Sequence, residues 1–307
     1  MNIALTGSSG FIGSQLAKHL KESKDINLIL LTRKKNLIFS EDEYSFEDFF
    51  SLKIEKEIDV FIHLASPNFD NEKNMILENG IFNLTKRILE ILPKYDCPNF
   101  IYFSSCKVYG ESSLDNNIFS EHSTPSPKSD YANAKFKAEN FIKKFCKKND
   151  IKFLIYRLPF VYGHGMKSNL SYILKIIDKS LPFFVPSNKL LLKKSFLYVG
   201  GILGIIDKNI RNINSINNEV FNLSDEYSIT LGEFIKNYKD LTKSNSFILV
   251  IPSKMFRFFC MLPLIGKFLI KVFGSFDIDN KKIKMYLKED IINTEAGISK
   301  LAKKKCI

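Results

Sequence analysis

The sequence has 307 residues, a formal net charge of +12, 45% apolar residues and 25% charged residues. These values are typical of a globular protein that is long enough to bury a large core. The lysines are spread along the chain as pairs, without the basic-aromatic platform of a nucleic-acid-binding protein, so we expect no nucleic-acid partner. An acidic substrate or an anionic membrane surface would match this charge better.

The five cysteines are odd in number and lack the spacing of metal ligands, so the sequence predicts no metal site. It predicts reduced thiols, as in a cytoplasmic protein. Because an apolar strand begins at residue 2, we expect no signal peptide. The most apolar late segment, residues 255–273, is interrupted by charged residues and falls short of the roughly 20 apolar residues that a membrane span needs.

A glycine-rich turn follows the first predicted strand, residues 2–6, and precedes a helical pattern. Gly7 permits the tight turn, Gly10 lets the backbone approach a pyrophosphate, and Gly13 lets the helix pack closely on the strand. The N–H groups and positive dipole end of that helix would then face the phosphates. The loop therefore predicts dinucleotide binding, with the candidate residues Gly7, Gly10, Phe11, Ile12 and Gly13.

The second predicted strand, residues 27–31, ends in a basic cluster that includes Arg33 and Lys34. In dinucleotide-binding folds an acidic residue at this strand end binds the ribose 2′-hydroxyl of NAD, whereas an arginine can accept the 2′-phosphate of NADP. No acidic residue follows this strand. The cofactor is therefore predicted to be NAD or NADP, and Arg33 favours NADP slightly.

Strands and helices alternate through the first half of the chain. Residues 36–57 are predicted to form a short connection and a helix, residues 59–65 a buried strand, residues 72–95 a helix, and residues 100–105 a further strand. This alternation predicts an α/β fold with a Rossmann-type, doubly wound parallel sheet. Leu64 and Ala65 are expected to lie under the cofactor. His63, in the middle of its strand, is expected to be a core residue.

A second informative stretch opens a helix over residues 131–148. Tyr131 and Lys135 are four residues apart, so both side chains project from the same face of this helix. A nearby ammonium stabilises a phenolate, so we expect Lys135 to lower the pKa of Tyr131 and make it a usable acid/base. Ser104 and Ser105 end the preceding strand and strengthen this interpretation.

Together these motifs resemble the extended short-chain dehydrogenase/reductases of the NAD-dependent epimerase/dehydratase type. The resemblance covers nearly the whole chain. It rests on the glycine loop, the fourth-strand signature at residues 62–65, the Ser/Thr strand at residues 103–110, the Tyr-x-x-x-Lys pair, and residues 157–163, which resemble the segment that contacts the nicotinamide and include Pro159.

The resemblance implies that Ser105, Tyr131 and Lys135 are catalytic. In this family the tyrosine exchanges the proton of a sugar hydroxyl while hydride passes between that carbon and the nicotinamide. The serine shares a hydrogen bond with the same oxygen, and the lysine also binds the nicotinamide ribose. Ser104 is expected to lie closer to the cofactor.

The second half resembles the nucleotide-sugar lobe of the family. Asn169 and Leu170 match the pair that meets the substrate diphosphate, and Lys194 stands where an arginine normally binds phosphate. The expected domains are residues 1–160 for the cofactor and 161–307 for the substrate, with segments near 196–224 returning to the first. The family also commonly pairs the helix of Tyr131 with its symmetry mate, so we expect a homodimer.

Residues 273–283 are similar to the C-terminal part of bacterial enzymes that make UDP-N-acetylquinovosamine. The resemblance thus implies a 4-keto reductase, formally a 4-dehydrogenase, of a UDP-hexose or UDP-N-acetylhexosamine in surface-polysaccharide synthesis. A UDP-sugar 4-epimerase is the main alternative, and a non-catalytic dinucleotide-binding regulator is another. A 4,6-dehydratase is disfavoured, because Cys106 and Lys107 stand where those enzymes have an Asp-Glu pair.

The apolar segment at residues 255–273 has two interpretations. It could lie on an anionic membrane surface as an interfacial helix broken near Pro263, or it could be a helical pair whose phenylalanines complete the core of the substrate lobe. We favour the core. The membrane interpretation stays open, because the segment also carries Arg257, Lys267 and Lys271.

Overall fold

The computed structural model of the protein describes residues 1–33, 42–66, 74–213, 218–288 and 291–303. The chain divides into two compact units. Unit 1 comprises Met1–Gly110, Thr124–Leu158 and Leu203–Phe221, and unit 2 comprises Glu111–Ser123, Pro159–Ile202 and Asn222–Ile307.

Unit 1 is built from strands that alternate with helices. In chain order its elements are β1 (Asn2–Thr6), α1 (Phe11–Lys21), β2 (Asn27–Thr32), β3 (Glu43–Ser45), α2 (Phe46–Phe50), β4 (Val60–His63), α3 (Asn74–Ile91), the short helix η1 (Leu92–Tyr95), β5 (Asn99–Ser105), the short helix η2 (Cys106–Tyr109), α4 (Asp130–Lys148), β7 (Lys152–Leu158), most of α6 (Val199–Arg211) and most of β12 (Glu219–Asn222).

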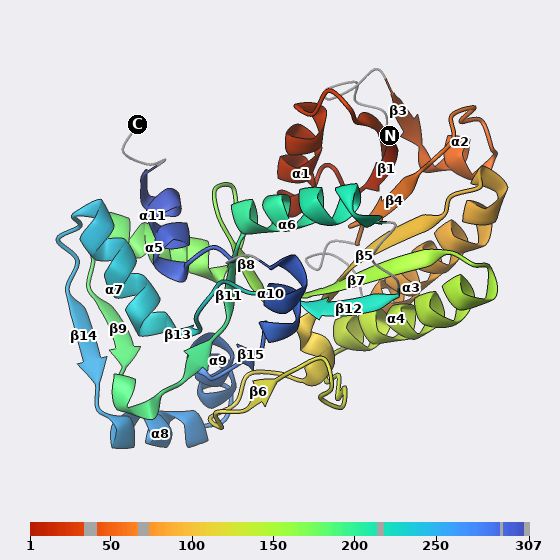
Figure 1. Cartoon of the computed structure of the whole chain (residues 1–307). Coiled ribbons are helices and arrows are strands. Elements are labelled where there is room, and N and C mark those ends of the chain that lie inside the picture. The colour runs from red at the N-terminus through yellow and green to blue at the C-terminus, as the bar shows by residue number, and fades with distance from the viewer. Residues whose placement is uncertain (34–41, 67–73, 214–217, 289–290, 304–307) are drawn as a thin grey trace. The chain divides into compact units, whose positions relative to one another are not determined.

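These strands form one seven-stranded sheet with the order β12-β7-β5-β4-β1-β2-β3 (Figure 1). The strands from β7 to β3 run parallel to their neighbours. The predicted α/β class with a Rossmann-type parallel sheet is therefore confirmed. In a parallel sheet the carboxyl ends of the strands meet at one edge, which is where such folds bind ligands.

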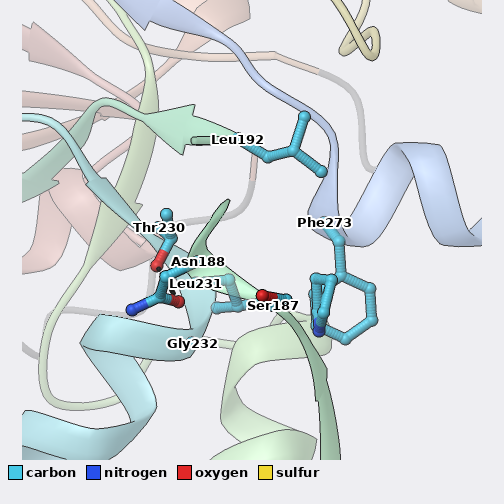
Figure 2. Close-up of a pocket in the computed structure, with 8 residues that line it drawn as sticks. Ser187, Asn188, Leu192, Thr230, Leu231, Gly232 and Phe273 are labelled. Atoms are coloured by element: carbon cyan, nitrogen blue, oxygen red, sulfur yellow. Dashed lines mark hydrogen bonds between the residues drawn. The ribbon is translucent and has the colours of Figure 1, made fainter. Parts of the chain in front are cut away.

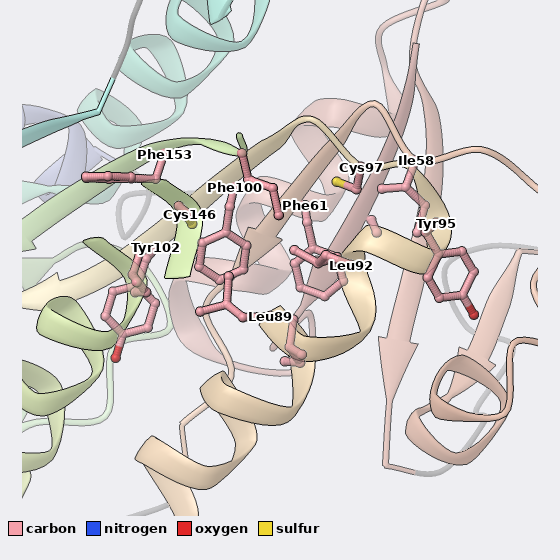
Figure 3. Close-up of a cluster of buried hydrophobic side chains, with 14 of the residues drawn as sticks. Ile58, Phe61, Leu89, Leu92, Tyr95, Cys97, Phe100, Tyr102, Cys146 and Phe153 are labelled. Carbon is pink, nitrogen blue, oxygen red and sulfur yellow. The ribbon is translucent and has the colours of Figure 1, made fainter. Parts of the chain in front are cut away.

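The sheet is covered on both faces, because β1, β4 and β5 are buried along almost their whole length. On one face, strand residues such as Phe61 and Phe100 pack in a cluster with Leu89 of α3 and Cys146 of α4 (Figure 3). Helix α1 buries Leu16 among other residues. Each such large apolar side chain contributes about 1.5–3 kcal/mol when fully buried.

The segment between β2 and β4 differs from its prediction. A short connection and a helix were expected, and the structure adds the edge strand β3 before helix α2. Ser45 and Asp48 form a capping box at the start of α2, which explains why the helix begins at Phe46. Residues 34–41 of the predicted connection lie outside the described residues.

Unit 2 consists of short elements around its own apolar core. In chain order they are β6 (Ile118–Phe119), β8 (Phe160–Tyr162), α5 (Asn169–Asp178), β9 (Phe183–Pro186), the short helix η3 (Asn188–Leu190), β10 (Lys193–Lys194), β11 (Phe196–Tyr198), β13 (Ile229–Thr230), α7 (Leu231–Thr242), β14 (Ile248–Ile251), α8 (Ser253–Met261), α9 (Ile265–Phe273), β15 (Asp277–Ile278), α10 (Lys281–Leu287) and α11 (Thr294–Lys303).

The core of unit 2 is centred on three buried aromatic rings. The centroids of Phe196 and Phe234 are 4.8 Å apart, and those of Tyr162 and Phe234 are 5.0 Å apart. Short strands of unit 2 form pairs, namely β8 with β11, β9 with β14, β10 with β13, and β6 with β15.

Within the described ranges, no helix is long and apolar enough to cross a membrane.

Two segments lie in a different unit from the one that their position in the sequence suggests. Residues 111–123 were expected in the first domain, but they belong to unit 2, because β6 pairs with β15. Leu203–Phe221 belongs to unit 1, because β12 joins the main sheet beside β7. Each unit is thus completed by a stretch of chain that is distant in sequence.

Candidate active site

The glycine loop between β1 and α1 leaves no room for side chains. Gly7 has a φ of +80°, and a Cβ there would lie 2.8 Å from the backbone nitrogen of Ala65. A Cβ on Gly13 would lie 2.0 Å from the carbonyl oxygen of Gly7, and one on Gly10 would lie 3.2 Å from the same oxygen. Gly7 and Gly13 are therefore required by the backbone itself, and the loop is as compact as the sequence predicts.

Helix α1 begins directly at this loop. Its N-cap, Gly10, provides no side-chain cap, and its first turn carries no acidic residue. The N–H groups of that turn, to which Phe11 and Ile12 belong, and the positive end of the helix dipole are therefore left for an anionic ligand. A dinucleotide pyrophosphate fits a cradle of this shape and charge, because a ligand can approach the bare backbone closely.

At the end of β2, Arg33 is exposed, and Lys34 lies outside the described residues. Sequence reasoning found no acidic residue here, but the structure brings one from β3. The hydroxyl of Thr32 donates a hydrogen bond to Oε1 of the buried Glu43 over 2.9 Å. The exposed charge at this strand end is nevertheless that of Arg33.

A chain of hydrogen bonds holds the carboxyl end of β4 beside the glycine loop. The backbone N–H of Ala65 donates to the Thr6 hydroxyl (3.2 Å), which lies 2.8 Å from Nδ1 of His63. Nε2 of His63 lies 3.0 Å from the Thr85 hydroxyl, which donates to the carbonyl oxygen of Ile81. This pattern assigns the ring proton to Nε2.

His63 is almost completely buried, and burial lowers its pKa to about 3. It is therefore a neutral core residue, as predicted. Its hydrogen bonds fix the backbone ahead of Leu64 and Ala65, whose side chains are only partly exposed. These two residues lie at the carboxyl end of β4, and Ala65 is close to Gly7.

Ser105, Tyr131 and Lys135 come from the end of β5 and the first turns of α4. Tyr131 forms a hydrogen bond with Ser105, and Nζ of Lys135 lies 5.9 Å from the centroid of the Tyr131 ring. The ammonium donates to the carbonyl oxygen of Phe103 over 2.8 Å. The cap of α4 holds Tyr131 in place, because the Ser129 hydroxyl accepts a hydrogen bond from the backbone of the first turn.

The electrostatics of this group differ from the prediction. Burial raises the pKa of Tyr131 to about 12, although the hydrogen bond with Ser105 opposes the increase. Burial also lowers the pKa of Lys135 to about 7, against the opposing charge of Glu139. The expectation that Lys135 brings the pKa of Tyr131 towards neutrality is therefore wrong for this structure, because desolvation dominates at both residues.

The side chains of Ser104 and Ser105 point to opposite faces of the sheet, because successive residues of a strand alternate between its two faces. Its hydroxyl donates to Oε1 of Glu139 over 2.5 Å, and the side chain is buried. Ser104 is also the register partner of Arg157 on β7. It therefore belongs to a buried polar network, which does not support its predicted contact with the cofactor.

This network was not found by sequence reasoning. Glu139 accepts two hydrogen bonds from Arg157, at 3.0 Å from Nε and 2.6 Å from Nη2, and Nη1 of Arg157 donates to the Tyr109 hydroxyl over 2.7 Å. All three residues are buried. Burial opposes the charge of Arg157, but Glu139 holds its pKa above the usual value. The only signal in the sequence is that Glu139 follows Lys135 by four residues.

The remaining predicted residues lie in unit 2. Asn169 is exposed at the start of α5, whereas the side chain of Leu170 is buried in the unit's core. Nζ of Lys194 donates to the Ser112 hydroxyl (3.2 Å) and to the carbonyl oxygen of Lys271 (2.9 Å). Pro159, which directly follows β7, is partly exposed.

Unit 2 also contains a small pocket beside the N-terminus of α7 (Figure 2). Its lining residues are Pro186, Ser187, Asn188, Leu192, Thr230, Leu231, Gly232 and Phe273. None of the predicted substrate residues lines it. The hydroxyl of Thr230 caps α7 and donates to Oδ1 of Asn188 over 3.5 Å. The polar side chains of Thr230 and Asn188 therefore stabilise the local fold of this pocket.

Comparison with known proteins places the chain in a family. The sequence model of the NAD dependent epimerase/dehydratase family matches residues 3–224. The chain belongs to this family. A UDP-glucose 4-epimerase of Vibrio cholerae is 25% identical over 311 residues, which span 96% of this chain and 88% of the relative. Membership makes this protein an NAD-dependent enzyme of the epimerase/dehydratase class.

Solved structures with this fold include two nucleotide-sugar epimerases. The UDP-glucose 4-epimerase of Thermotoga maritima with UDP-glucose has a TM-score of 0.77, with 20% identity over 99% of this chain and 98% of that one. The UDP-glucuronic acid 4-epimerase of Bacillus cereus with NAD also has a TM-score of 0.77, with 18% identity over 99% and 98% of the two chains. At these identities the likeness establishes the fold.

Proposed function

We propose that this epimerase/dehydratase family member is a cytoplasmic, NAD(P)-dependent oxidoreductase that acts at C4 of a UDP-hexose or UDP-N-acetylhexosamine. One observation carries the proposal. Ser105, Tyr131 and Lys135 gather at the carboxyl end of β5, which is the same sheet edge as the glycine loop after β1. A hydroxyl group held by Ser105 and Tyr131 would therefore lie at the ligand-binding edge of the sheet.

We assign the catalytic roles to the three side chains as follows. Tyr131 exchanges a proton with the oxygen on C4, and Ser105 shares the hydrogen bond to that oxygen. The ammonium of Lys135 is held by its hydrogen bond to the carbonyl oxygen of Phe103. In this position it can also donate a hydrogen bond to a ribose hydroxyl of the cofactor. The nicotinamide of the cofactor supplies or accepts the hydride when bound.

The protonation of Tyr131 suits the reduction of a 4-keto sugar. Burial raises its pKa to about 12, so the phenol carries its proton at neutral pH and can donate it to a carbonyl oxygen. A 4-keto reductase and the second half of an epimerisation both need this donor, and we propose the reductase, in surface-polysaccharide synthesis, because of the resemblance of residues 273–283. The absence of an Asp-Glu pair at Cys106 and Lys107 continues to disfavour a 4,6-dehydratase.

The alternative function is a UDP-sugar 4-epimerase, which oxidises C4 and then returns hydride to the opposite face. It is favoured by the relative in Vibrio cholerae, which is named a UDP-glucose 4-epimerase and matches almost the whole chain. Both reactions use the same three side chains, so their geometry does not separate them. A non-catalytic regulator is less well supported, because Tyr131 and Lys135 are both present and close together.

We assign the substrate diphosphate to unit 2. Asn169 and the first-turn N–H of Leu170 at the start of α5 are suited to bind phosphate, because a helix N-terminus attracts anions. Lys194 retains the positive charge of the arginine that it replaces but lacks a bidentate fork. Its contact with Ser112 holds the ammonium in place.

A panel of UDP-sugars and UDP-4-keto-sugars tests the proposal. A reductase oxidises one equivalent of NADPH or NADH for each 4-keto-sugar consumed, which is followed by nucleotide absorbance. An epimerase converts a UDP-sugar into its C4 isomer with no net change in absorbance, which is followed by chromatography of the sugar products. If neither activity is found although the protein binds the cofactor, the non-catalytic alternative is correct.

We predict a preference for NADP(H) that depends on Arg33. Replacing Arg33 with Ala is expected to weaken NADPH binding about tenfold while leaving NADH binding nearly unchanged, because only NADPH carries the 2′-phosphate. Titration of cofactor fluorescence measures both affinities, and Lys18→Ala, an exposed change on α1, is the control. Equal or tighter binding of NADH by the unaltered protein would contradict the prediction.

A further inference from the structure

Helices α8 and α9 of unit 2, together with the turn between them, expose a row of large apolar side chains. Phe256 and Phe273 are buried. In contrast, the exposed fractions are 60% for Phe258, 83% for Met261, 82% for Leu264, 54% for Ile265 and 59% for Phe268. The expectation that this helical pair completes the core is therefore confirmed for Phe256 and Phe273, but it does not hold for this exposed row.

The turn between α8 and α9 holds its apolar tip in a strained conformation. Leu264 has a φ of +67° and a ψ of −58°, and the backbone N–H of Ile265 donates to the carbonyl oxygen of Pro263 over 2.8 Å. This is a γ-turn of the rare, strained kind. Gly266 fits tightly in the same turn, since a Cβ there would lie 2.0 Å from the carbonyl oxygen of Cys260. Such strain is often kept for a function.

Along the segment that forms this row, the charged residues have one sign. Residues 241–276 contain no aspartate or glutamate but carry five basic residues, namely Lys243, Lys254, Arg257, Lys267 and Lys271. On the helices, all four basic side chains are exposed. Strand β14 and its partner β9 add the exposed side chains of Val250 and Phe184, and residues 179–206 around β9 also lack acidic residues.

We propose that α8, α9 and the turn between them bind the surface of an anionic lipid bilayer. Apolar side chains at the tip would enter the interface between headgroups and acyl chains, and the flanking cations would contact lipid phosphates. A second copy of the chain fits this surface poorly, because a two-fold interface would bring the same cations together without acidic partners. The proposal does not depend on which UDP-sugar the enzyme uses.

Cosedimentation of the full chain with vesicles tests this surface. Binding is expected to vesicles of phosphatidylglycerol mixed with phosphatidylcholine, and little to phosphatidylcholine alone, and salt should weaken it. Lys254→Glu with Lys267→Glu is expected to reduce the affinity about tenfold or more, since each basic residue near an anionic surface contributes roughly a factor of five. The control is Lys18→Glu with Lys24→Glu, which makes the same charge change at two exposed positions of unit 1.

A second variant separates insertion from charge. Met261→Gln with Leu264→Gly removes the apolar tip and is expected to weaken binding by about tenfold. Glycine adopts positive φ without strain, so the urea midpoint should not fall. The proposal is overturned if the unaltered protein fails to bind anionic vesicles at low salt, or if the control variant of Lys18 and Lys24 loses binding equally. It is also overturned if this variant turns a dimer into a monomer by light scattering, because the surface would then be an interface between copies.

Discussion

Replacing Tyr131 with Phe is expected to lower turnover about 10²–10⁴-fold, the loss typical of removing a general acid/base. The Tyr131 phenol is hydrogen-bonded to Ser105, which places it to exchange a proton with a substrate oxygen held at the same point. Cofactor affinity should be nearly unchanged, because we assign the main cofactor contacts to the glycine loop and Lys135. Steady-state kinetics on the substrate found in the panel, together with cofactor titration, measure both quantities.

The matched control for this change is Tyr95→Phe. Tyr95 is also buried in unit 1, but it ends η1, ahead of β5, and its hydroxyl donates to the carbonyl oxygen of Phe49 in α2. Its loss should cost about 1 kcal/mol of stability, as for one buried hydrogen bond, and leave turnover intact. Near-normal turnover in Tyr131→Phe would show that another group transfers the proton.

Replacing Glu139 with Gln is expected to destabilise unit 1 by about 3–5 kcal/mol, because it leaves the guanidinium of Arg157 buried without its countercharge. The pair is almost completely inaccessible, with 3% of the Arg157 side chain and none of the Glu139 side chain exposed. The oxygen of the new amide can still accept from Ser104, but its NH2 group would face Nη2 of Arg157, so that two donors would meet without an acceptor. The midpoint of urea unfolding measures the loss.

An exposed ion pair provides the control. Glu90 and Lys86 lie 3.6 Å apart on α3, with about half of each side chain exposed. Glu90→Gln makes the same chemical change, but surface pairs contribute only about 0–1 kcal/mol, so the midpoint should scarcely move. Equal effects of the two substitutions would refute the structural importance of the buried network.

The Glu139 substitution should also change the pH profile of the enzyme. Lys135 has a pKa of about 7, lowered by burial and raised by the charge of Glu139. Without that charge the pKa falls further, so Lys135 becomes neutral at a lower pH. Any limb of the kcat/KM profile that reports loss of the ammonium should therefore move to lower pH in Glu139→Gln. A loss of stability alone would leave that limb in place.

Features set by neighbouring residues could be predicted from the sequence. Strand β1, the glycine loop and α1 follow from residues within one βα turn, and so does the shared face of Tyr131 and Lys135. The apolar runs of β4 and β5 correctly predicted a sheet covered on both faces. These features depend on the spacing and the steric requirements of residues that are close together in the sequence, so they can be predicted from it.

Other features were decided only by the tertiary structure. Glu139 pairs with Arg157 because the order of β5, β7 and α4 brings them together, across 18 positions of chain. The pKa of Tyr131 rises because burial outweighs its hydrogen bond, and burial depends on everything packed around the ring. Phe256 and Phe273 enter the core of unit 2, whereas Phe258 and Phe268 on the same two helices face solvent, because only one face of each helix packs against that core. The spacing of residues in the sequence predicts which side chains share one face of a helix or strand. The burial of those side chains depends on which other parts of the chain pack against that face.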